Sequence, residues 1–259
     1  MQKTLLIVML MVFSFHSFAQ SKKKDRQEEK RAQINEMVRL EEEGVITHQK
    51  SIAVGLKLTT DGYGAFFEIG RASSVKRALL FQLDISERKH VKEEKIGSMY
   101  SQSIPYVYGK INSFYPVKLG VQQQILLGNK SNKNGVGVTG NIGGGASLAL
   151  LRPYYVQVSR GNALDYIKYN SPDSLDFLGS NIFGGPSLSK GWNEMIVTPG
   201  VYAKAALRFD YGIFNEIVSA IEVGINGEYY TKKIPQMAYN EEKKFFYGAY
   251  FSLIFGKRK

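Results

Sequence analysis

The chain contains no cysteine among its 259 residues, which excludes disulfide bonds, thiolate metal centres and lipid anchoring through an N-terminal cysteine. Beyond the first 18 residues it also has no long apolar run. A helix that spans a bilayer needs about 20 predominantly apolar residues, so a helical inner-membrane protein is excluded. Histidine is scarce as well, with three in the whole chain, and chemistry that needs several imidazole groups therefore has few candidates.

The first residues predict export. A short start that contains one lysine precedes an apolar run from Leu5 to Phe18, and small residues flank Phe18. The run is short for a membrane anchor, so we expect a signal peptide at residues 1–19 that is cleaved after Ala19. The net charge of the chain is +11. Because an exported protein rarely meets nucleic acid, we expect this positive charge to contact outer-membrane lipid and lipopolysaccharide.

Residues 20–50 form a charged segment unlike the rest of the chain. Lys22–Lys24 open it and Glu41–Glu43 close it, an order that opposes the helix macrodipole, so the sequence predicts only a short, marginal periplasmic helix that ends near Gly44. Its apolar residues are too few for a core of their own. We interpret them as the contact with a periplasmic or outer-membrane protein partner, and the alternative is a solvated, disordered leader. The contact residues are Ile34, Met37, Val38 and Leu40.

From residue 51 to residue 259 the chain alternates between apolar and polar residues with a period of two. In Val201–Tyr211, for example, every odd position is apolar and the even positions include Lys204, Arg208 and Asp210. This period indicates a β-strand with one apolar face, and a helix would not sort the residues in this way. The pattern recurs in eight segments, at residues 52–59, 65–69, 79–85, 115–125, 136–150, 201–211, 217–229 and 245–255.

No apolar face of these segments carries a charge. On the lipid face of a barrel a charge at mid-depth costs about 2–4 kcal/mol, whereas a soluble lipocalin-like barrel would have a polar exterior and an apolar cavity. The pattern therefore predicts an all-β fold, a transmembrane antiparallel up-and-down β-barrel of about eight strands at residues 51–259. The opposite faces carry the ions of a predicted lumen network: Lys57, Glu68, Asp84, Lys118, Lys204, Arg208, Asp210, Glu222 and Glu228.

Connection lengths predict the orientation. Short connections at 71–76, 128–135 and 212–216 alternate with long ones at 87–112, 160–194 and 231–244, and only the turn at 60–63 is short where a long loop is due. Outer-membrane barrels have short periplasmic turns and long external loops. We therefore expect an outer-membrane location with both termini in the periplasm. A hairpin around Gly212 would place Glu222 diagonal to Lys204 and Arg208, so that these charges neutralise one another.

Several segments together resemble the small outer-membrane β-barrel proteins of Bacteroidota. They are the signal ending SFAQ, YVYGKINSFYPVKLG, LLGNKSNKNGVGV, GGGASLALLRPYY, the KKIPQMA loop and the terminal FFYGAYFSLIFGKRK. That family is largely uncharacterised, so the resemblance implies an architecture and no activity. The chain departs from the general outer-membrane pattern at its end, where Phe255 is followed by Gly256-Lys257-Arg258-Lys259 instead of being the last residue.

Two kinds of surface feature stand out beside the strands. The basic stretch Arg88–Lys95 is a candidate for binding lipopolysaccharide phosphates, and the alternative is a solvated charged face. Aromatic rings are stable at head-group depth, so those near the strand ends fit interfacial girdles. The girdle candidates are Tyr115, Tyr154, Tyr155, Phe209, Tyr211, Tyr229, Tyr247 and Phe255.

Function divides into three hypotheses. Eight strands leave an interior just wide enough for side chains, which favours a non-enzymatic barrel that acts as an envelope scaffold or as an accessory subunit of a larger outer-membrane complex. A lipid A-modifying or hydrolytic enzyme would need His90, with Ser86 and Glu93 as neighbours. A narrow channel or transporter would use the inward ions as its path. No metal-spaced cluster or cofactor motif occurs, and no cofactor is expected.

Overall fold

The computed structural model describes residues 31, 50–74, 76–97, 104–128, 135–160, 163–170, 174–179, 181–185, 187, 189–212 and 217–259. The signal peptide, the N-terminal helix and the contact residues Ile34, Met37, Val38 and Leu40 fall outside these ranges and stay predictions. No helix among the described residues is long and apolar enough to cross a membrane.

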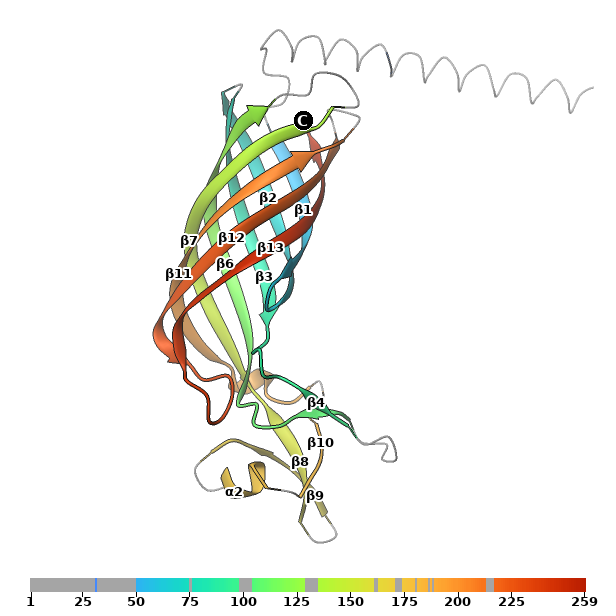
Figure 1. Ribbon diagram of the computed structural model, residues 1–259, viewed down its shortest axis with the longest axis vertical. Coiled ribbons are helices and arrows are strands. Elements are labelled where there is room, and N and C mark those ends of the chain that lie inside the picture. Colours follow the sequence, from blue (N-terminus) through green and yellow to red (C-terminus); the bar gives the residue numbers. More distant parts are fainter. Residues whose placement is uncertain are drawn as a thin grey trace, which may run out of the picture.

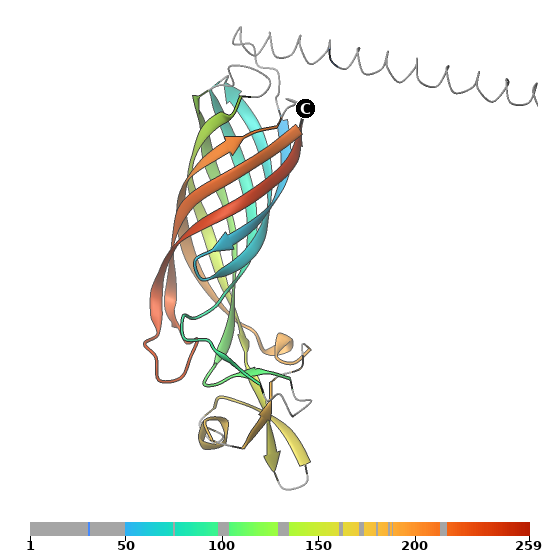
Figure 2. The same ribbon diagram turned by 45° about the vertical axis from the view of Figure 1, so that its right-hand side comes forward.

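Eight long strands form a closed antiparallel barrel, which confirms the predicted all-β architecture and the number of strands (Figures 1 and 2). Strands that are consecutive along the barrel are also neighbours in the ring, and β13 pairs with β1 to close it. Closure leaves no unpaired strand edge in the barrel. The strands are β1 (Lys50–Thr59), β2 (Gly62–Ser74), β3 (Arg77–Arg88), β6 (Asn112–Gly128), β7 (Gly137–Pro153), β11 (Ile196–Asp210), β12 (Ile217–Ile234) and β13 (Lys243–Arg258).

The two ends of the barrel differ. At one end, the terminal rim, β1 begins and β13 ends, and the backbones of Lys50 and Lys259 exchange hydrogen bonds of 2.9 and 2.8 Å. The connections at this rim are short, at 75–76, 129–136 and 211–216. The other end, the cap rim, has the tight turn at 60–61 and the three long connections, at 89–111, 154–195 and 235–242. The predicted alternation of short and long connections is therefore present.

Two of the three long connections contain secondary structure of their own, which the alternating pattern of the sequence did not predict. After β7, β8 (Tyr155–Arg160) pairs with β9 (Ala163–Lys168) and β10 (Ile182–Gly184) in a separate three-stranded sheet. Two short helices, α2 (Ser174–Phe177) and η1 (Trp192–Glu194), lie in the same connection. The connection before β6 adds a two-stranded sheet of β4 (Lys95–Ile96) and β5 (Tyr106–Val107).

The three long connections share one apolar core. Val107 comes from the first connection, Met237 from the third, and the rest from the second: Tyr154, Val156, Val158, Ile167 and Phe177. Backbone hydrogen bonds also join the connections, from Gly185 to Ile104 (2.7 Å) and from Ala238 to Gly109 (2.7 Å). We call the described residues of 89–111, 154–195 and 235–242 the cap. It extends from the barrel as a small folded unit (Figure 1).

Candidate functional site

The barrel is polar inside and apolar outside, because successive residues of a strand point to opposite faces of the wall. Leu56 and Ile225 on the outer face are 63% and 64% exposed, whereas Glu222 on the inner face is fully buried. The nine ions that the sequence assigned to the lumen all point inward, and none is more than 9% exposed. A buried ion must be paired or hydrogen-bonded, so the partners of these side chains decide what the interior can do.

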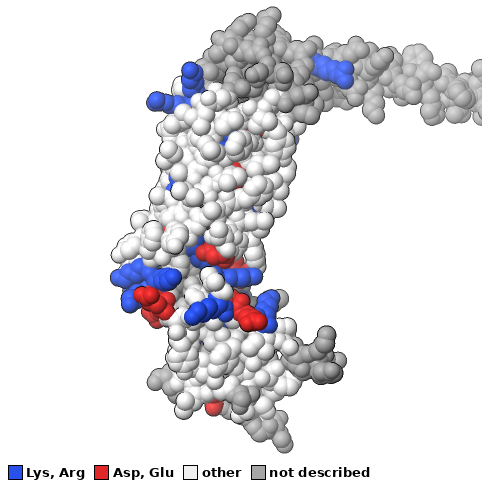
Figure 3. Space-filling model, viewed as in Figure 1, with Lys and Arg blue, Asp and Glu red and all other residues white. Residues whose placement is uncertain are grey.

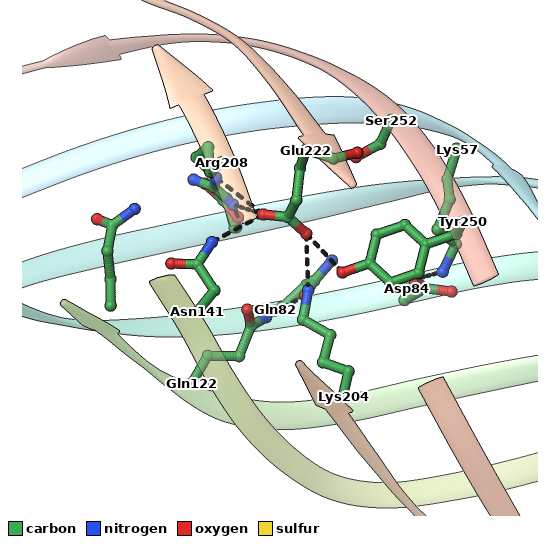
Figure 4. A network of polar contacts seen from close by, with 12 residues as sticks. Lys57, Gln82, Asp84, Gln122, Asn141, Lys204, Arg208, Glu222, Tyr250 and Ser252 are labelled. Carbon is green, nitrogen blue, oxygen red and sulfur yellow. Dashed lines mark hydrogen bonds and ion pairs between the residues drawn. The ribbon is translucent and has the colours of Figure 1, made fainter. Parts of the chain in front are cut away.

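Glu222 on β12 lies at the centre of the first ionic cluster (Figure 4). Its Oε1 accepts hydrogen bonds from Tyr250 Oη (2.7 Å) and Lys204 Nζ (3.2 Å). Its Oε2 accepts from Arg208 Nε (2.8 Å) and Asn141 Nδ2 (2.8 Å). Donors from three other strands, β7, β11 and β13, therefore converge on one carboxylate of β12.

Arg208 extends this cluster across the lumen. Two of its guanidinium nitrogens donate to Glu68 at 2.6 and 2.8 Å, while Glu222 accepts from its other side. Glu222 stands directly opposite Arg208 in the β11–β12 register, not diagonal to it as the sequence suggested. Charge-assisted, bidentate contacts of this kind are the strong form of a side-chain hydrogen bond. Lys204 also donates to Gln82 (2.7 Å), and Gln122 donates to the same oxygen.

A second ionic cluster lies closer to the cap. Asp84 pairs with Lys57 and, at 3.9 Å, with Lys118, whose Nζ is 2.7 Å from Glu228. Glu228 also accepts from Tyr230 Oη at 2.7 Å. Arg88 then joins Glu228 (3.4 Å) to Asp61 (2.6 Å) in the turn between β1 and β2. The ninth predicted ion, Asp210, does not join either cluster, because it pairs with Arg258 at the terminal rim.

Charges in the two clusters balance. Five cations, Lys57, Arg88, Lys118, Lys204 and Arg208, face five anions, Asp61, Glu68, Asp84, Glu222 and Glu228. An interior with no net charge does not attract ions of either sign into it.

Apolar residues close the lumen on both sides of the ions. Along β12 the inward residues run from Val218 and Ala220 through Glu222 and Glu228 to Tyr230. Near the terminal rim the apolar layer is Ala53, Phe66, Val218, Ala220 and Ile254. Near the cap rim the rings of Phe114, Tyr230 and Phe246 pack with centroids 5.3–6.0 Å apart, and the Arg88 guanidinium lies 5.2 Å from the centre of the Phe246 ring.

Glycines make this filling possible. In the run Gly143-Gly144-Gly145 on β7, a Cβ atom at Gly143 would lie 2.6 Å from Cα of Gln122 and 2.3 Å from the carbonyl oxygen of Val121. At Gly55 a Cβ would meet the Phe66 ring at 2.2 Å. Both positions therefore allow a neighbouring strand or ring to approach more closely than any side chain would permit.

Several members of the clusters were missed by sequence reasoning. Arg88 was assigned to the loop after β3, although it continues the inward register of Gln82, Asp84 and Ser86 and could have been found by that spacing. Asp61 lies in a turn, where no period-two pattern exists. The neutral members are Gln82, Gln122, Asn141, Tyr230 and Tyr250, which are ordinary lumen residues by sequence alone.

The outer surface separates into bands (Figure 3). The barrel wall is largely free of charge, and Lys, Arg, Asp and Glu gather where the barrel meets the cap. Exposed rings stand near the strand ends, among them Tyr211, Tyr229, Tyr247 and Phe255. One girdle candidate was wrong: Tyr154 is buried in the core of the cap, where its hydroxyl accepts a hydrogen bond from the Val107 backbone N–H (3.0 Å). This burial raises the pKa of the Tyr154 hydroxyl.

His90 lies in a turn of the cap. Its Nδ1 accepts the backbone N–H of Lys92 (3.2 Å), and its own backbone N–H donates to Glu93 (3.0 Å). The Glu93 carboxylate in turn accepts from Lys110 Nζ at 2.6 Å. Burial lowers the pKa of the His90 imidazole. Ser86, the proposed neighbour, is directed into the lumen, with its hydroxyl 3.5 Å from Asp84, so the three residues are not brought together as a catalytic group.

A second polar contact stabilises the far side of the cap. Glu194 accepts a hydrogen bond from Tyr155 Oη (2.8 Å) and pairs with Lys168. These hydrogen bonds, the one from Lys168 first, hold the pKa of the Glu194 carboxyl below its ordinary value. Trp192 beside it stacks on Tyr115, with centroids 5.8 Å apart, and the Arg152 guanidinium lies 4.7 Å from the Trp192 ring centre. Among the described residues no three His, Asp or Glu side chains converge as a metal site.

No family model matches the chain, and no curated protein matches its sequence. Among solved structures it is similar to the N-terminal β-barrel domain of Pseudomonas aeruginosa OprF, with 11% identity over 81% of this chain and 99% of that one and a TM-score of 0.34. It is also similar to Neisserial surface protein A (10% identity, 80% and 95% coverage, TM-score 0.35). The attachment invasion locus protein Ail of Yersinia pestis matches at 9% identity, with 81% and 96% coverage and a TM-score of 0.35.

Proposed function

We propose that this chain is an outer-membrane β-barrel protein with a closed lumen, which acts as a non-enzymatic envelope scaffold or as an accessory subunit of a larger outer-membrane complex. The observation that carries the proposal is the inverted polarity of the barrel. Its outer wall is apolar and its interior holds ten paired ions, in two clusters of balanced charge. Water would penalise that exterior, whereas lipid stabilises it.

The height of the uncharged wall supports a membrane location. On β13 the residues from Phe245 to Gly256 carry no charge, and exposed lysines stand on both sides, at Lys244 and Lys257. Twelve residues at about 3.3 Å each, tilted by about 45°, span roughly 28 Å along the barrel axis, close to the ~25 Å apolar band of outer-membrane barrels. The termini lie at the rim with short turns, so we place that rim in the periplasm and the cap outside.

The filled interior favours a scaffold role and argues against a channel. A conduction path needs water or mobile charge along the axis, whereas here each ion of the two clusters is paired and apolar layers lie above and below. The cap supports a role in contact with other molecules. A barrel of this size does not need a separately folded cap to remain inserted. The folded cap therefore favours a binding surface that other molecules contact.

Single-cysteine labelling tests the location. Because the chain has no cysteine, Leu175→Cys in the cap and Arg77→Cys at the terminal rim each create one target. Leu175 is 87% exposed and Arg77 is exposed. An impermeant maleimide should label Leu175→Cys on intact cells, and should label Arg77→Cys only after the outer membrane is permeabilised. Reversed labelling, or recovery of the protein in the soluble fraction, would contradict the proposal.

The accessory-subunit role depends on residues 20–50. We propose that Ile34, Met37, Val38 and Leu40 contact a protein partner. Deleting residues 22–44 should leave a barrel that inserts and keeps its heat-modifiable migration, while proteins that co-purify in mild detergent are lost. If the deletion changes neither the co-purifying proteins nor the envelope, residues 20–50 are a leader and the protein is a scaffold without this partner.

A further inference from the structure

The hairpin of β12 and β13 changes its geometry where it leaves the barrel. The two strands pair regularly up to Tyr229 and Phe245, then the register shifts, and pairing resumes between Ile234 and Lys243. The β12 strand therefore holds extra residues at this point, which is a β-bulge. Because a bulge interrupts the alternation of faces, the three successive residues Thr231, Lys232 and Lys233 are all exposed.

Four lysines consequently gather on one exposed ribbon. Lys232 and Lys233 lie on β12, and Lys243 and Lys244 lie on the paired end of β13. We call these four residues the lysine ribbon. In the described part of the chain none of them has an ion-pair partner, whereas the cations of the lumen are all paired. Glu241 and Glu242, which precede Lys243 in sequence, lie in the hairpin connection, and Glu228, four residues before Lys232, is buried in the lumen. Figure 3 shows the charges gathered at this junction.

Exposed rings fix the depth of the ribbon. Tyr229 and Phe245 face each other in the register just before the bulge, and the rings of Phe245 and Tyr247 lie 6.0 Å apart. Amphipathic rings are stable at the boundary between acyl chains and head groups. The lysines follow within one to four residues, about 3–13 Å further along the strands, so they lie on the head-group side of these rings, toward the lipid phosphates.

A second basic segment adjoins the ribbon. Lys89 follows β3, and its ammonium group lies 5.2 Å from the centre of the Tyr63 ring on β2. Burial is the largest cause that lowers the pKa of His90; the charge of Glu93 raises this pKa, and the charges of Lys243 and Lys92 lower it. This loop is not uniformly positive, because Glu93 accepts hydrogen bonds from the His90 backbone N–H and from Lys110, so the lysine ribbon is the basic surface considered below.

We propose that the lysine ribbon, together with the rings of Tyr229, Phe245 and Tyr247, binds the phosphate groups of a lipid A-type glycolipid in the outer leaflet. The ribbon supplies unpaired cations at phosphate depth, and the rings pack against the sugar and the first methylene groups of the acyl chains. This inference rests on the proposed function, because it requires the cap rim to face outward. Attraction between exposed charges weakens with salt, so binding should fall as ionic strength rises.

Native mass spectrometry of the full chain, refolded in detergent micelles, tests the site with two probes. These are bisphosphorylated lipid A and the same lipid with both phosphates removed. The test variant carries Lys→Gln at positions 232, 233, 243 and 244. The matched control carries Gln at Lys50, Arg71, Arg77 and Lys257, four exposed cations of the terminal rim, and so loses the same charge at the opposite end.

Wild type and the terminal-rim variant should retain bisphosphorylated lipid A, and neither should retain the dephosphorylated lipid. One lysine near a lipid phosphate contributes about fivefold in affinity, so the ribbon variant should bind at least about tenfold more weakly. Equal retention by wild type and the ribbon variant, an equal loss in the terminal-rim variant, or complete displacement by equimolar inorganic phosphate would overturn the site. Heat-modifiable migration of each sample reports barrel formation separately. Labelling of Leu175→Cys and Arg77→Cys on intact cells reports orientation independently of lipid binding, so failure of the proposed function is distinguishable from failure of the site.

Discussion

Glu222 shows at the scale of one residue why the lumen is stable. Its fully buried carboxylate accepts hydrogen bonds from Lys204, Arg208, Asn141 and Tyr250. A buried carboxylate is costly in isolation, and it is tolerated here because every donor around it is positive or polar. The cost returns if one partner is removed, since the remaining charges cannot reach water.

Replacing Glu222 with Gln should therefore destabilise the barrel strongly. Lys204 would lose its carboxylate partner and Arg208 would retain only Glu68. Breaking a buried ion pair from one side costs about 3–5 kcal/mol, which a urea titration of the refolded protein followed by heat-modifiable migration would measure. Glu241→Gln, at an exposed position in the β12–β13 connection, should change stability by less than about 0.5 kcal/mol. Equal stabilities of the two variants would show that Glu222 does not hold the network.

The glycines permit a second test at residue scale. In Gly143→Ala the new methyl group would lie 2.3 Å from the carbonyl oxygen of Val121, so β6 and β7 would have to move apart. Overpacking of this kind costs about 1–3 kcal/mol. Gly227→Ala is the matched control, because its Cβ meets nothing closer than the Phe245 ring at 3.7 Å. In the same urea titration, Gly143→Ala should have a clearly lower free energy of unfolding than Gly227→Ala. The opposite order would contradict the close approach of β6 and β7.

The membership of the ion network was largely predictable, and so was the pairing of Glu222 with Lys204 and Arg208, but the pairing across the lumen was not. Period two identifies which side chains point inward, because that depends only on the strand itself. Partner choice depends on which strands face each other across the closed ring. Glu68 on β2 and Arg208 on β11 are not neighbours in the sheet, yet they form the bidentate pair of the lumen. No local pattern in the sequence contains that information.

At the scale of elements, the eight barrel strands were predictable and the cap was not. Each barrel strand has a long run in which apolar and polar residues alternate, and lipid outside with ions inside makes the contrast strong. The cap core instead collects Val107, Phe177 and Met237 from three separate connections. Val156 and Val158 on β8 do alternate, but the run is too short to be separated from β7 by sequence.

The cap should be separable from the barrel by a mutation in its core. Phe177 is fully buried there, and removal of a buried phenylalanine side chain costs about 3–5 kcal/mol. In Phe177→Ala we expect the cap to open and to be cut by trypsin or chymotrypsin, while the barrel keeps its heat-modifiable migration. Leu175→Ala in the same short helix, where the side chain is exposed, should remain uncut. Loss of the barrel itself in Phe177→Ala would show that the cap and barrel fold as one unit.

At the scale of the whole molecule, the stacked layers predict that the protein does not conduct. The Phe114–Tyr230–Phe246 rings and the apolar layer around Ile254 lie on opposite sides of the lumen ions, and the ten ions of the two clusters neutralise one another. Planar-bilayer recordings of refolded protein should show no stable conductance steps at salt concentrations where a porin control opens. Reproducible steps from the purified wild type would contradict a filled lumen.

The shared core of the cap also imposes an order on assembly. Three connections from different parts of the chain contribute to it, so it cannot form until β3, β6, β7, β11, β12 and β13 have brought their ends together. In the proposed orientation these connections cross the bilayer unfolded, and the cap folds only on the far side. Once folded, it is wider than any extended loop and must unfold before the strands can withdraw. Unfolding of the cap would thus limit the rate of extraction, and the barrel would leave the membrane much more slowly than it inserts.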